Sequence, residues 1–214
     1  MRIIPAVNCH FKDFDCVHKK VKAAETFSGN GFIHLDVADG AFTYNKTWSD
    51  LGLWKDLRTN LKLEVHLMVL NPAEVAEAWC FAGAKRIIVH AEVLNEESAK
   101  IIADLSQKNG FSRMLALNPE TTVQSAENFF KYFMEFQTLA VHPGLAGQKF
   151  LPEVLPKIKY LRAKYPSAII EVDGGINQET AKLAEAAGAD FATAASFIFG
   201  SRDPKLAFEM LNRA

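Results

Sequence analysis

The sequence has little cysteine, no long hydrophobic run and no excess of charge of either sign. Its 214 residues include three cysteines, Cys9, Cys16 and Cys80, and no C-x-x-C pair. A small, odd number of cysteines argues against a secreted disulfide framework and predicts free thiols in a reducing compartment. The 24 basic and 25 acidic residues give a formal net charge of −1, so no basic field would attract nucleic acid or an anionic membrane.

The sequence also lacks an apolar segment long enough to cross a membrane. The apolar run at its N-terminus is too short for a signal peptide. We therefore expect a cytoplasmic protein with neither a membrane nor a nucleic acid as partner. No linker, low-complexity tract or shift in composition divides the chain. A chain of this length buries a large core without disulfides or structural metal, so we expect one catalytic domain over residues 1–214.

Short apolar runs alternate with longer amphipathic stretches along the chain. The apolar runs begin near residues 2, 32, 61, 86, 111, 138, 168 and 189, and each interval holds a pattern typical of one helix. Eight strand–helix units predict either a closed (β/α)₈ TIM barrel or an open doubly wound sheet. The first apolar run leads into the letters PAVNC at residues 5–9. Because a dinucleotide-binding sheet usually has G-x-G-x-x-G at this point, the barrel is favoured.

Polar side chains lie on the face of three predicted strands that should point into the barrel. In the letters FIHLDVADG, His34 and Asp36 share one face, while the apolar residues between them face the helices. The same alternation turns His66 inward on the third strand and Asp173 inward on the seventh. Two histidines and two carboxylates suit one divalent ion such as Zn²⁺, Fe²⁺, Mn²⁺ or Co²⁺. The alternative is a structural His34–Asp36 hydrogen bond without metal.

Histidines are concentrated near the C-terminal ends of the predicted strands, where barrels of this kind carry their functional groups. Five of the six histidines lie there, at positions 10, 34, 66, 90 and 142. We expect them to converge on the mouth of the barrel. His90 and His142 are candidates to support the metal ligands without binding the ion themselves.

Short turns rich in small residues follow the last three predicted strands. They are Gly144-Leu145-Ala146-Gly147, Gly174-Gly175 and Ala195-Ser196. Glycine lets backbone N–H groups approach an anion closely, and loops after strands seven and eight often bind phosphate in such barrels. The three turns together predict a phosphate site; the alternative is that each glycine serves only its own turn.

These segments resemble the ribulose-phosphate 3-epimerase family. The matching letters are HLDVADG at 34–40, VHLM at 65–68, VHPGLAGQKF at 141–150 and EVDGGIN at 171–177, and the resemblance runs from Ile4 to about Phe199. It implies a (β/α)₈ barrel that holds one divalent metal ion and interconverts D-ribulose 5-phosphate and D-xylulose 5-phosphate at C3. It also implies a homo-oligomer.

The resemblance further implies a role for individual residues. His34, Asp36, His66 and Asp173 would bind the metal, and Asp36 and Asp173 would be the catalytic acid–base pair, one on each face of C3. The metal would chelate O2 and O3 of the sugar and stabilise the enediolate. The substrate would be bound by Met68, Gly144, Leu145, Ala146, Gly147, Gly174, Gly175, Ala195 and Ser196.

The sequence departs from the family pattern at positions around the substrate. Ala6 stands where the family has a serine and Asn8 where it has a leucine, and Ala38, Tyr44, Leu139 and Ala195 are further departures. None of them is a predicted ligand or base. Two other hypotheses remain open: an epimerase of a related ketose phosphate such as allulose 6-phosphate, or a catalytically weak barrel that only binds a sugar phosphate.

Overall fold

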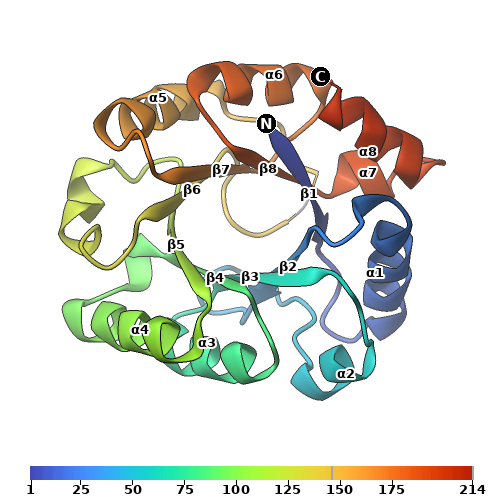
Figure 1. Cartoon of the computed structure of the whole chain (residues 1–214), viewed down its shortest axis with the longest axis horizontal. Coiled ribbons are helices and arrows are strands. Elements are labelled where there is room, and N and C mark those ends of the chain that lie inside the picture. The colour runs from blue at the N-terminus through green and yellow to red at the C-terminus, as the bar shows by residue number, and fades with distance from the viewer. Residues whose placement is uncertain (146, 214) are drawn as a thin grey trace.

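The structure is a computed structural model, and it describes residues 1–145 and 147–213. In these ranges eight parallel strands close into a barrel in the order of the sequence, with β1 paired to β8 (Figure 1). The strands are β1 (Arg2–Val7), β2 (Phe32–Ala38), β3 (Lys62–Met68), β4 (Arg86–His90), β5 (Ser112–Leu117), β6 (Glu135–Leu139), β7 (Ile169–Asp173) and β8 (Phe191–Ala194). The predicted (β/α)₈ TIM barrel is confirmed, and the open sheet is excluded.

Helices surround the barrel and pack on its outer face (Figure 1). They are α1 (Phe14–Ser28), α2 (Leu51–Asp56), α3 (Pro72–Phe81), α4 (Glu96–Asn109), α5 (Leu155–Lys164), α6 (Gln178–Ala187), α7 (Ser196–Phe199) and α8 (Pro204–Asn212). Their ends follow local chemistry. The Asp13 side chain accepts a hydrogen bond from the Cys16 backbone N–H at the start of α1, and Gly110 ends α4 in the left-handed conformation.

One interval differs from the prediction of a helix after every strand. Between β5 and β6 the chain forms only the short 3₁₀ helix η2 (Gln124–Phe129), and β6 begins at Glu135 rather than near residue 138. Phe129, Phe130 and Phe133 are buried there. The short 3₁₀ helix and the turn after it bury all three side chains without a longer α-helix. Two more 3₁₀ helices are η1 (Ala91–Val93) and η3 (Pro152–Val154).

Strand alternation separates an apolar layer from a polar interior. Ile33 and Leu35 of β2 face outward and belong to the hydrophobic core, as do Val17 and Val21 of α1. Each such side chain contributes about 1.5–3 kcal/mol by leaving water. The inward positions of the strands carry buried polar side chains as well as apolar ones. The polar side chains include His34, Glu64, His66, Gln137 and Glu171. The ionisable side chains of the barrel interior therefore lie below its mouth.

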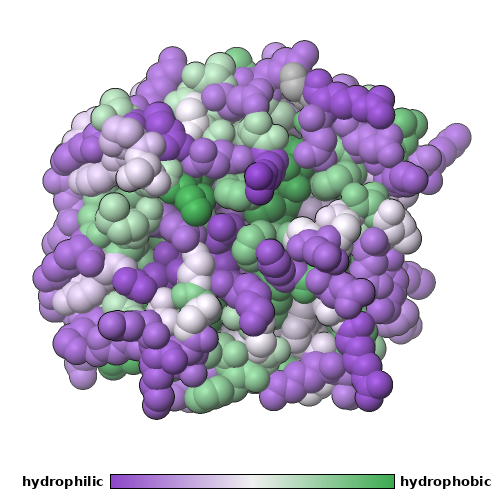
Figure 2. All heavy atoms as spheres, viewed as in Figure 1, coloured by the Kyte–Doolittle hydropathy of each residue, from purple (hydrophilic) through white to green (hydrophobic). Residues whose placement is uncertain are grey.

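The face of the molecule shown in Figure 2 is mainly hydrophilic. In the view of Figure 2, hydrophilic side chains form most of the rim, and hydrophobic residues show between them. None of the helices in the described ranges combines the length and the apolar character that a membrane span requires.

The two cysteines near the N-terminus form a disulfide, so the prediction of free thiols is wrong for them. Cys9 follows β1 and Cys16 lies in the first turn of α1, with Cα atoms 6.1 Å apart, a separation that a disulfide spans readily. The chain turns back from strand to helix between these two residues, which brings them together without a C-x-x-C spacing. Cys80 is a free thiol, as predicted.

Candidate active site at the mouth of the barrel

The four side chains predicted as ligands meet inside the C-terminal mouth. The register of β2 and β3 sets Asp36 beside His66, and β7 brings Asp173 toward them. Asp36 Oδ1 lies 3.2 Å from His34 Nε2 and 3.1 Å from His66 Nδ1, and His66 Nδ1 lies 3.7 Å from Asp173 Oδ2. One donor atom from each residue lies within 4.8 Å of the others. The cluster is therefore able to hold a metal ion, whose ligands sit about 2.0–2.2 Å from its centre.

The two carboxylates of this cluster differ in their electrostatics. Both are buried, which disfavours their charge, but the neighbouring His34 and His66 hold the pKa of Asp36 well below its usual range. Burial and the nearby charge of Asp36 raise the pKa of Asp173. Although burial opposes its charge, hydrogen bonds to Asp36 and Glu64 raise the pKa of His34 well above the usual value. Without a cation, a proton on His34 takes the place of the positive charge that the carboxylates require.

The far side of His34 is held by a buried ionic cluster. His34 Nδ1 donates to Glu64 Oε1 at 2.7 Å, and Glu64 Oε2 is paired with Arg86. Arg86 also lies 3.5 Å from Glu171, which accepts a hydrogen bond of 2.9 Å from Gln137. A carboxylate behind a histidine fixes its orientation and makes it a better ligand. His34 thus directs Nε2, its other nitrogen, toward Asp36.

A second chain of contacts fixes His66. His66 Nε2 lies 2.8 Å from His90 Nε2, and His90 Nδ1 lies 3.2 Å from Glu92 Oε2. Burial lowers the pKa of His90 to about 4, so the His90 ring is neutral near pH 7. A neutral His90 that donates through Nδ1 to Glu92 accepts at Nε2 from His66. The lone pair of His66 is then on Nδ1, facing Asp36 Oδ1. In this tautomer His66 Nδ1 and Asp36 Oδ1 offer two lone pairs 3.1 Å apart, and the donor set therefore fits a divalent ion.

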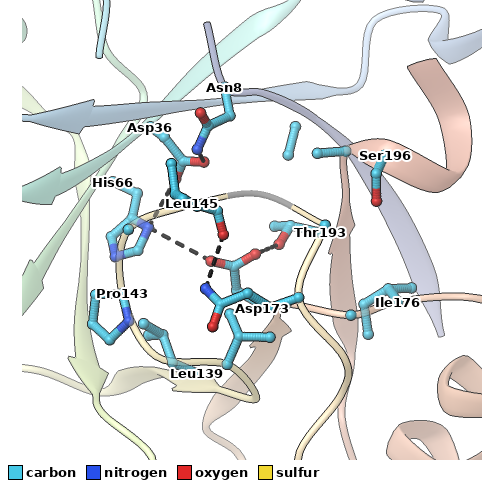
Figure 3. A pocket seen from close by; sticks show the side chains of 18 of the residues that line it. Asn8, Asp36, His66, Leu139, Pro143, Leu145, Asp173, Ile176, Thr193 and Ser196 are labelled. Atoms are coloured by element: carbon cyan, nitrogen blue, oxygen red, sulfur yellow. Dashed lines mark hydrogen bonds and ion pairs between the residues drawn. The ribbon is translucent and has the colours of Figure 1, made fainter. Parts of the chain in front are cut away.

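A cavity opens above this cluster, and Asp36 and Asp173 reach it from different strands (Figure 3). Of the predicted site residues, those that line it are Asp36, His66, Met68, Gly144, Leu145, Gly147, Asp173, Gly174, Gly175, Ala195 and Ser196. His34 has no exposed surface and lies behind Asp36 and His66, which line the cavity. Ala146 lies outside the described residues.

The glycine turns line the cavity, and Figure 3 shows Ile176 and Ser196 on the side away from His66, with Pro143 on the same side as His66. Gly175 has a φ of +65°, and a Cβ there would fall on the backbone of Phe150. Only glycine allows the loop after β7 to pass this close to the loop after β6. Asn45 Nδ2 donates to the backbone oxygen of Gly144 at 3.2 Å, which joins the loop after β2 to the same turn. The phosphate role of these turns stays a prediction.

Two of the five histidines expected at the mouth do not join the cluster. His142 is exposed and pairs with Glu120 at 2.7 Å, so it supports no ligand. His10 is exposed as well and lies against Phe11. Both residues come after the end of their strand, where alternation no longer controls side-chain direction. His90, by contrast, supports His66 as expected.

The sequence-based prediction missed two groups that touch the two carboxylates. The Thr193 hydroxyl donates to Asp173 Oδ1, and Asn8 Nδ2 donates to Asp36 Oδ2 at 2.9 Å. Thr193 follows the inward alternation of β8, which could have indicated it. Asn8 was noted only as a departure from a family pattern.

Comparison with known proteins places this site in a family. The model of the ribulose-phosphate 3-epimerase family matches residues 6–199. The chain belongs to that family. The ribulose-phosphate 3-epimerase of Bacillus subtilis is 38% identical over 202 residues, which cover 91% of each chain. That of Chlamydia trachomatis is 38% identical over 195 residues, covering 87% of this chain and 82% of the relative. The cytoplasmic isoform of rice is 37% identical over 184 residues, covering 82% and 78%.

Membership in this family confirms the resemblance found in the sequence and makes the protein an enzyme of the epimerase class. Solved structures with lower identity share its fold alone. The 3-hexulose-6-phosphate synthase of Salmonella typhimurium has a TM-score of 0.72 at 14% identity, covering 100% of this chain and 97% of that one. The orotidine 5'-monophosphate decarboxylase of Sulfolobus solfataricus has a TM-score of 0.68 at 14% identity, covering 99% and 96%.

Proposed function

We propose that this protein interconverts D-ribulose 5-phosphate and D-xylulose 5-phosphate by moving the proton at C3. One observation carries the proposal. Asp36 and Asp173 reach one cavity from opposite parts of the barrel, and both lie within 4.8 Å of two histidine nitrogens. Epimerisation requires a base on each face of the same carbon, and a pair of carboxylates at one metal-capable cluster supplies both.

The two carboxylates exchange roles with the direction of the reaction. In one direction Asp36 removes the C3 proton, the C–H electron pair moves into an enediolate, and Asp173 returns a proton to the opposite face. In the reverse direction Asp173 is the base and Asp36 the acid. The pKa of Asp173 is raised and that of Asp36 is lowered, so the two carboxylates differ in their affinity for a proton, as an acid and a base do.

His34, Asp36, His66 and Asp173 are the residues we propose to hold the ion, with Zn²⁺, Fe²⁺, Mn²⁺ and Co²⁺ as the candidates for a set of two nitrogens and two carboxylates. When bound, a divalent ion would supply positive charge beside the sugar oxygens and lower the energy of the enediolate. Glu64 and His90 orient the two histidines for this role.

The rest of the cavity completes the proposal. The turns at Gly144, Gly174 and Ser196 would bind the phosphate group, and Met68 would pack against the carbon chain. The cytoplasm is the proposed location, supported by the rice relative named a cytoplasmic isoform, and a homo-oligomer is the proposed assembly.

A comparison of two substrates tests the function. We expect the metal-loaded protein to convert D-ribulose 5-phosphate to D-xylulose 5-phosphate, with kcat/KM at least about tenfold higher than for D-allulose 6-phosphate, because a pocket fitted to one chain length loses about that factor for an extra carbon group. A preference for the hexulose phosphate would move the assignment to that substrate. Binding of either sugar without turnover would identify a barrel that only binds sugar phosphates.

A further inference from the structure

Asn8 lies at the end of β1 and touches one of the two carboxylates. It directly follows Val7, the last residue of the strand, and its side chain lines the cavity. Its Nδ2 donates a hydrogen bond of 2.9 Å to Asp36 Oδ2 (Figure 3). The proposed acid–base mechanism does not use this residue.

The two oxygens of Asp36 face different partners. Oδ1 points to the ligand cluster, 3.2 Å from His34 and 3.1 Å from His66. Oδ2 points away from it and meets Asn8. An ion held by the cluster would engage Oδ1, which leaves Oδ2 as the oxygen that can exchange a proton with a substrate.

Asp173 repeats this arrangement from the other side of the cavity. Its Oδ2 faces His66 at 3.7 Å, and its Oδ1 accepts a hydrogen bond from the Thr193 hydroxyl. Each carboxylate therefore has one oxygen at the cluster and one oxygen held by a neutral donor. Asn8 and Thr193 are counterparts on the two sides of the site.

Asn8 is itself fixed from behind. Lys20 of α1 donates from Nζ to the Asn8 backbone oxygen at 2.9 Å, and Cys9 is joined to Cys16 of α1 by the disulfide. Two links to the same helix thus hold the backbone at Asn8 and directly after it, and β1 holds the backbone directly before it. A residue held this firmly keeps the direction of the group that it contacts.

We propose that Asn8 is a positioning residue for the proton-transferring oxygen of Asp36. A carboxylate oxygen has two lone pairs. The Asn8 amide occupies one of them and leaves the other directed into the cavity. The C3–H bond then breaks, the new O–H bond forms on Oδ2 of Asp36, and the electron pair remains on the sugar. This inference rests on the proposed epimerase function.

Asn8→Leu tests it, because leucine removes the donor with little change in volume. We expect kcat to fall about 10- to 100-fold, the range expected for loss of a hydrogen bond to a charged group, with KM within about threefold because only the proton transfer would be affected. Because the equilibrium constant fixes the ratio of kcat/KM in the two directions, the forward and reverse rates fall together. The informative readout is the deuterium isotope effect on kcat/KM, measured with each epimer deuterated at C3.

The isotope effects separate positioning from a general structural role. Slower transfer through Asp36 should raise the isotope effect for the epimer that Asp36 deprotonates and lower it for the other. Thr193→Val, the counterpart at Asp173, should shift the two effects in the opposite sense. Unchanged isotope effects in Asn8→Leu, or shifts in the same sense as in Thr193→Val, would overturn the proposal. If Asn8→Leu does not fold by circular dichroism, Asn8→Ala removes the same donor and is measured instead.

A partial rescue and the wild-type rate complete the design. Asn8→Ser keeps a shorter donor, and we expect a rate between those of wild type and Asn8→Leu. Wild-type protein is assayed first on D-ribulose 5-phosphate. Absence of turnover there would overturn the proposed function and this inference together. Normal wild-type turnover with unaltered isotope effects in the variants would overturn the inference alone.

Discussion

Replacing Arg86 with methionine removes the guanidinium that contacts two fully buried glutamates. Arg86 Nη1 pairs with Glu64 and lies 3.5 Å from Glu171, and neither carboxylate has exposed surface. Methionine retains most of the packing volume but none of the charge. Loss of one partner from a buried ionic pair costs about 3–5 kcal/mol, and we expect a loss of this size in the free energy of unfolding at pH 7.

The pH dependence of this loss follows from the pKa of Glu64. In the wild type burial opposes the charge, but His34 and Arg86 keep the pKa of Glu64 below its usual value. Without Arg86, this folded-state pKa rises relative to the wild type. A raised folded-state pKa stabilises the protein at low pH and destabilises it as pH increases through that value. The difference between variant and wild type should therefore be smaller at pH 5 than at pH 7.

Urea unfolding followed by circular dichroism at both pH values measures the effect, with metal content held constant. Arg213→Met is the matched control, because Arg213 is exposed and its ion pair with Glu209 lies at the surface; it should change stability little. A loss below about 1 kcal/mol for Arg86→Met, the range of an exposed pair, would refute the assignment of Arg86 as the charge that the barrel interior depends on. So would a loss that is the same at pH 5 and pH 7.

Three other predictions concern separate parts of the fold. Gly175→Ala should lower the free energy of unfolding by more than about 1 kcal/mol and raise KM for the sugar phosphate. Gly110→Ala, at a similar φ of +72° but in open space, should affect stability alone. Urea unfolding and steady-state kinetics distinguish the two variants. Cys16→Ser should cost about 2 kcal/mol from the loss of a short loop closure, and alkylation of the native protein should label Cys80 but not Cys9; labelling of Cys9 would contradict the disulfide. Burial lowers the pKa of Lys157 to about 8, so above that pH the unfolded chain binds more protons than the folded protein. The free energy of unfolding of wild type, relative to Lys157→Met, should therefore rise between pH 8 and pH 10. A difference that does not change with pH in urea unfolding would show that Lys157 titrates normally.

Much of the fold and of the ligand cluster could be predicted because strands alternate strictly. His34 and Asp36 are two residues apart, and the apolar residues around them have to face the helices, so their inward direction follows from sequence. The parallel register then sets His66 beside Asp36, and the closed barrel brings Asp173 to within 3.7 Å of His66. The failures lie where alternation ends. His10 and His142 follow their strands and turn outward, and the interval after β5 folds as a short 3₁₀ helix rather than an α-helix.

Contacts between distant segments were harder to predict. The disulfide depends on how tightly the chain turns from β1 into α1, and the hydrogen bond from Asn8 depends on where β1 ends relative to Asp36. Neither leaves a periodic pattern. The ionic cluster of Arg86 also escaped prediction, although Glu64 and Glu171 follow the inward alternation of their strands.

The central claim is that two carboxylates at one metal-capable cluster exchange the C3 proton on opposite faces of a ketose phosphate. Proton NMR of D-ribulose 5-phosphate in D₂O tests it directly, with metal-stripped protein and then with Mn²⁺, Zn²⁺ or Fe²⁺ restored. We predict that deuterium appears at C3 and D-xylulose 5-phosphate forms only after a metal is added. We also predict that Asp36→Asn and Asp173→Asn each slow epimerisation by at least about 100-fold, the contribution of a positioned acid or base. Exchange by the stripped protein, or epimerisation near the wild-type rate in either variant, would contradict the claim.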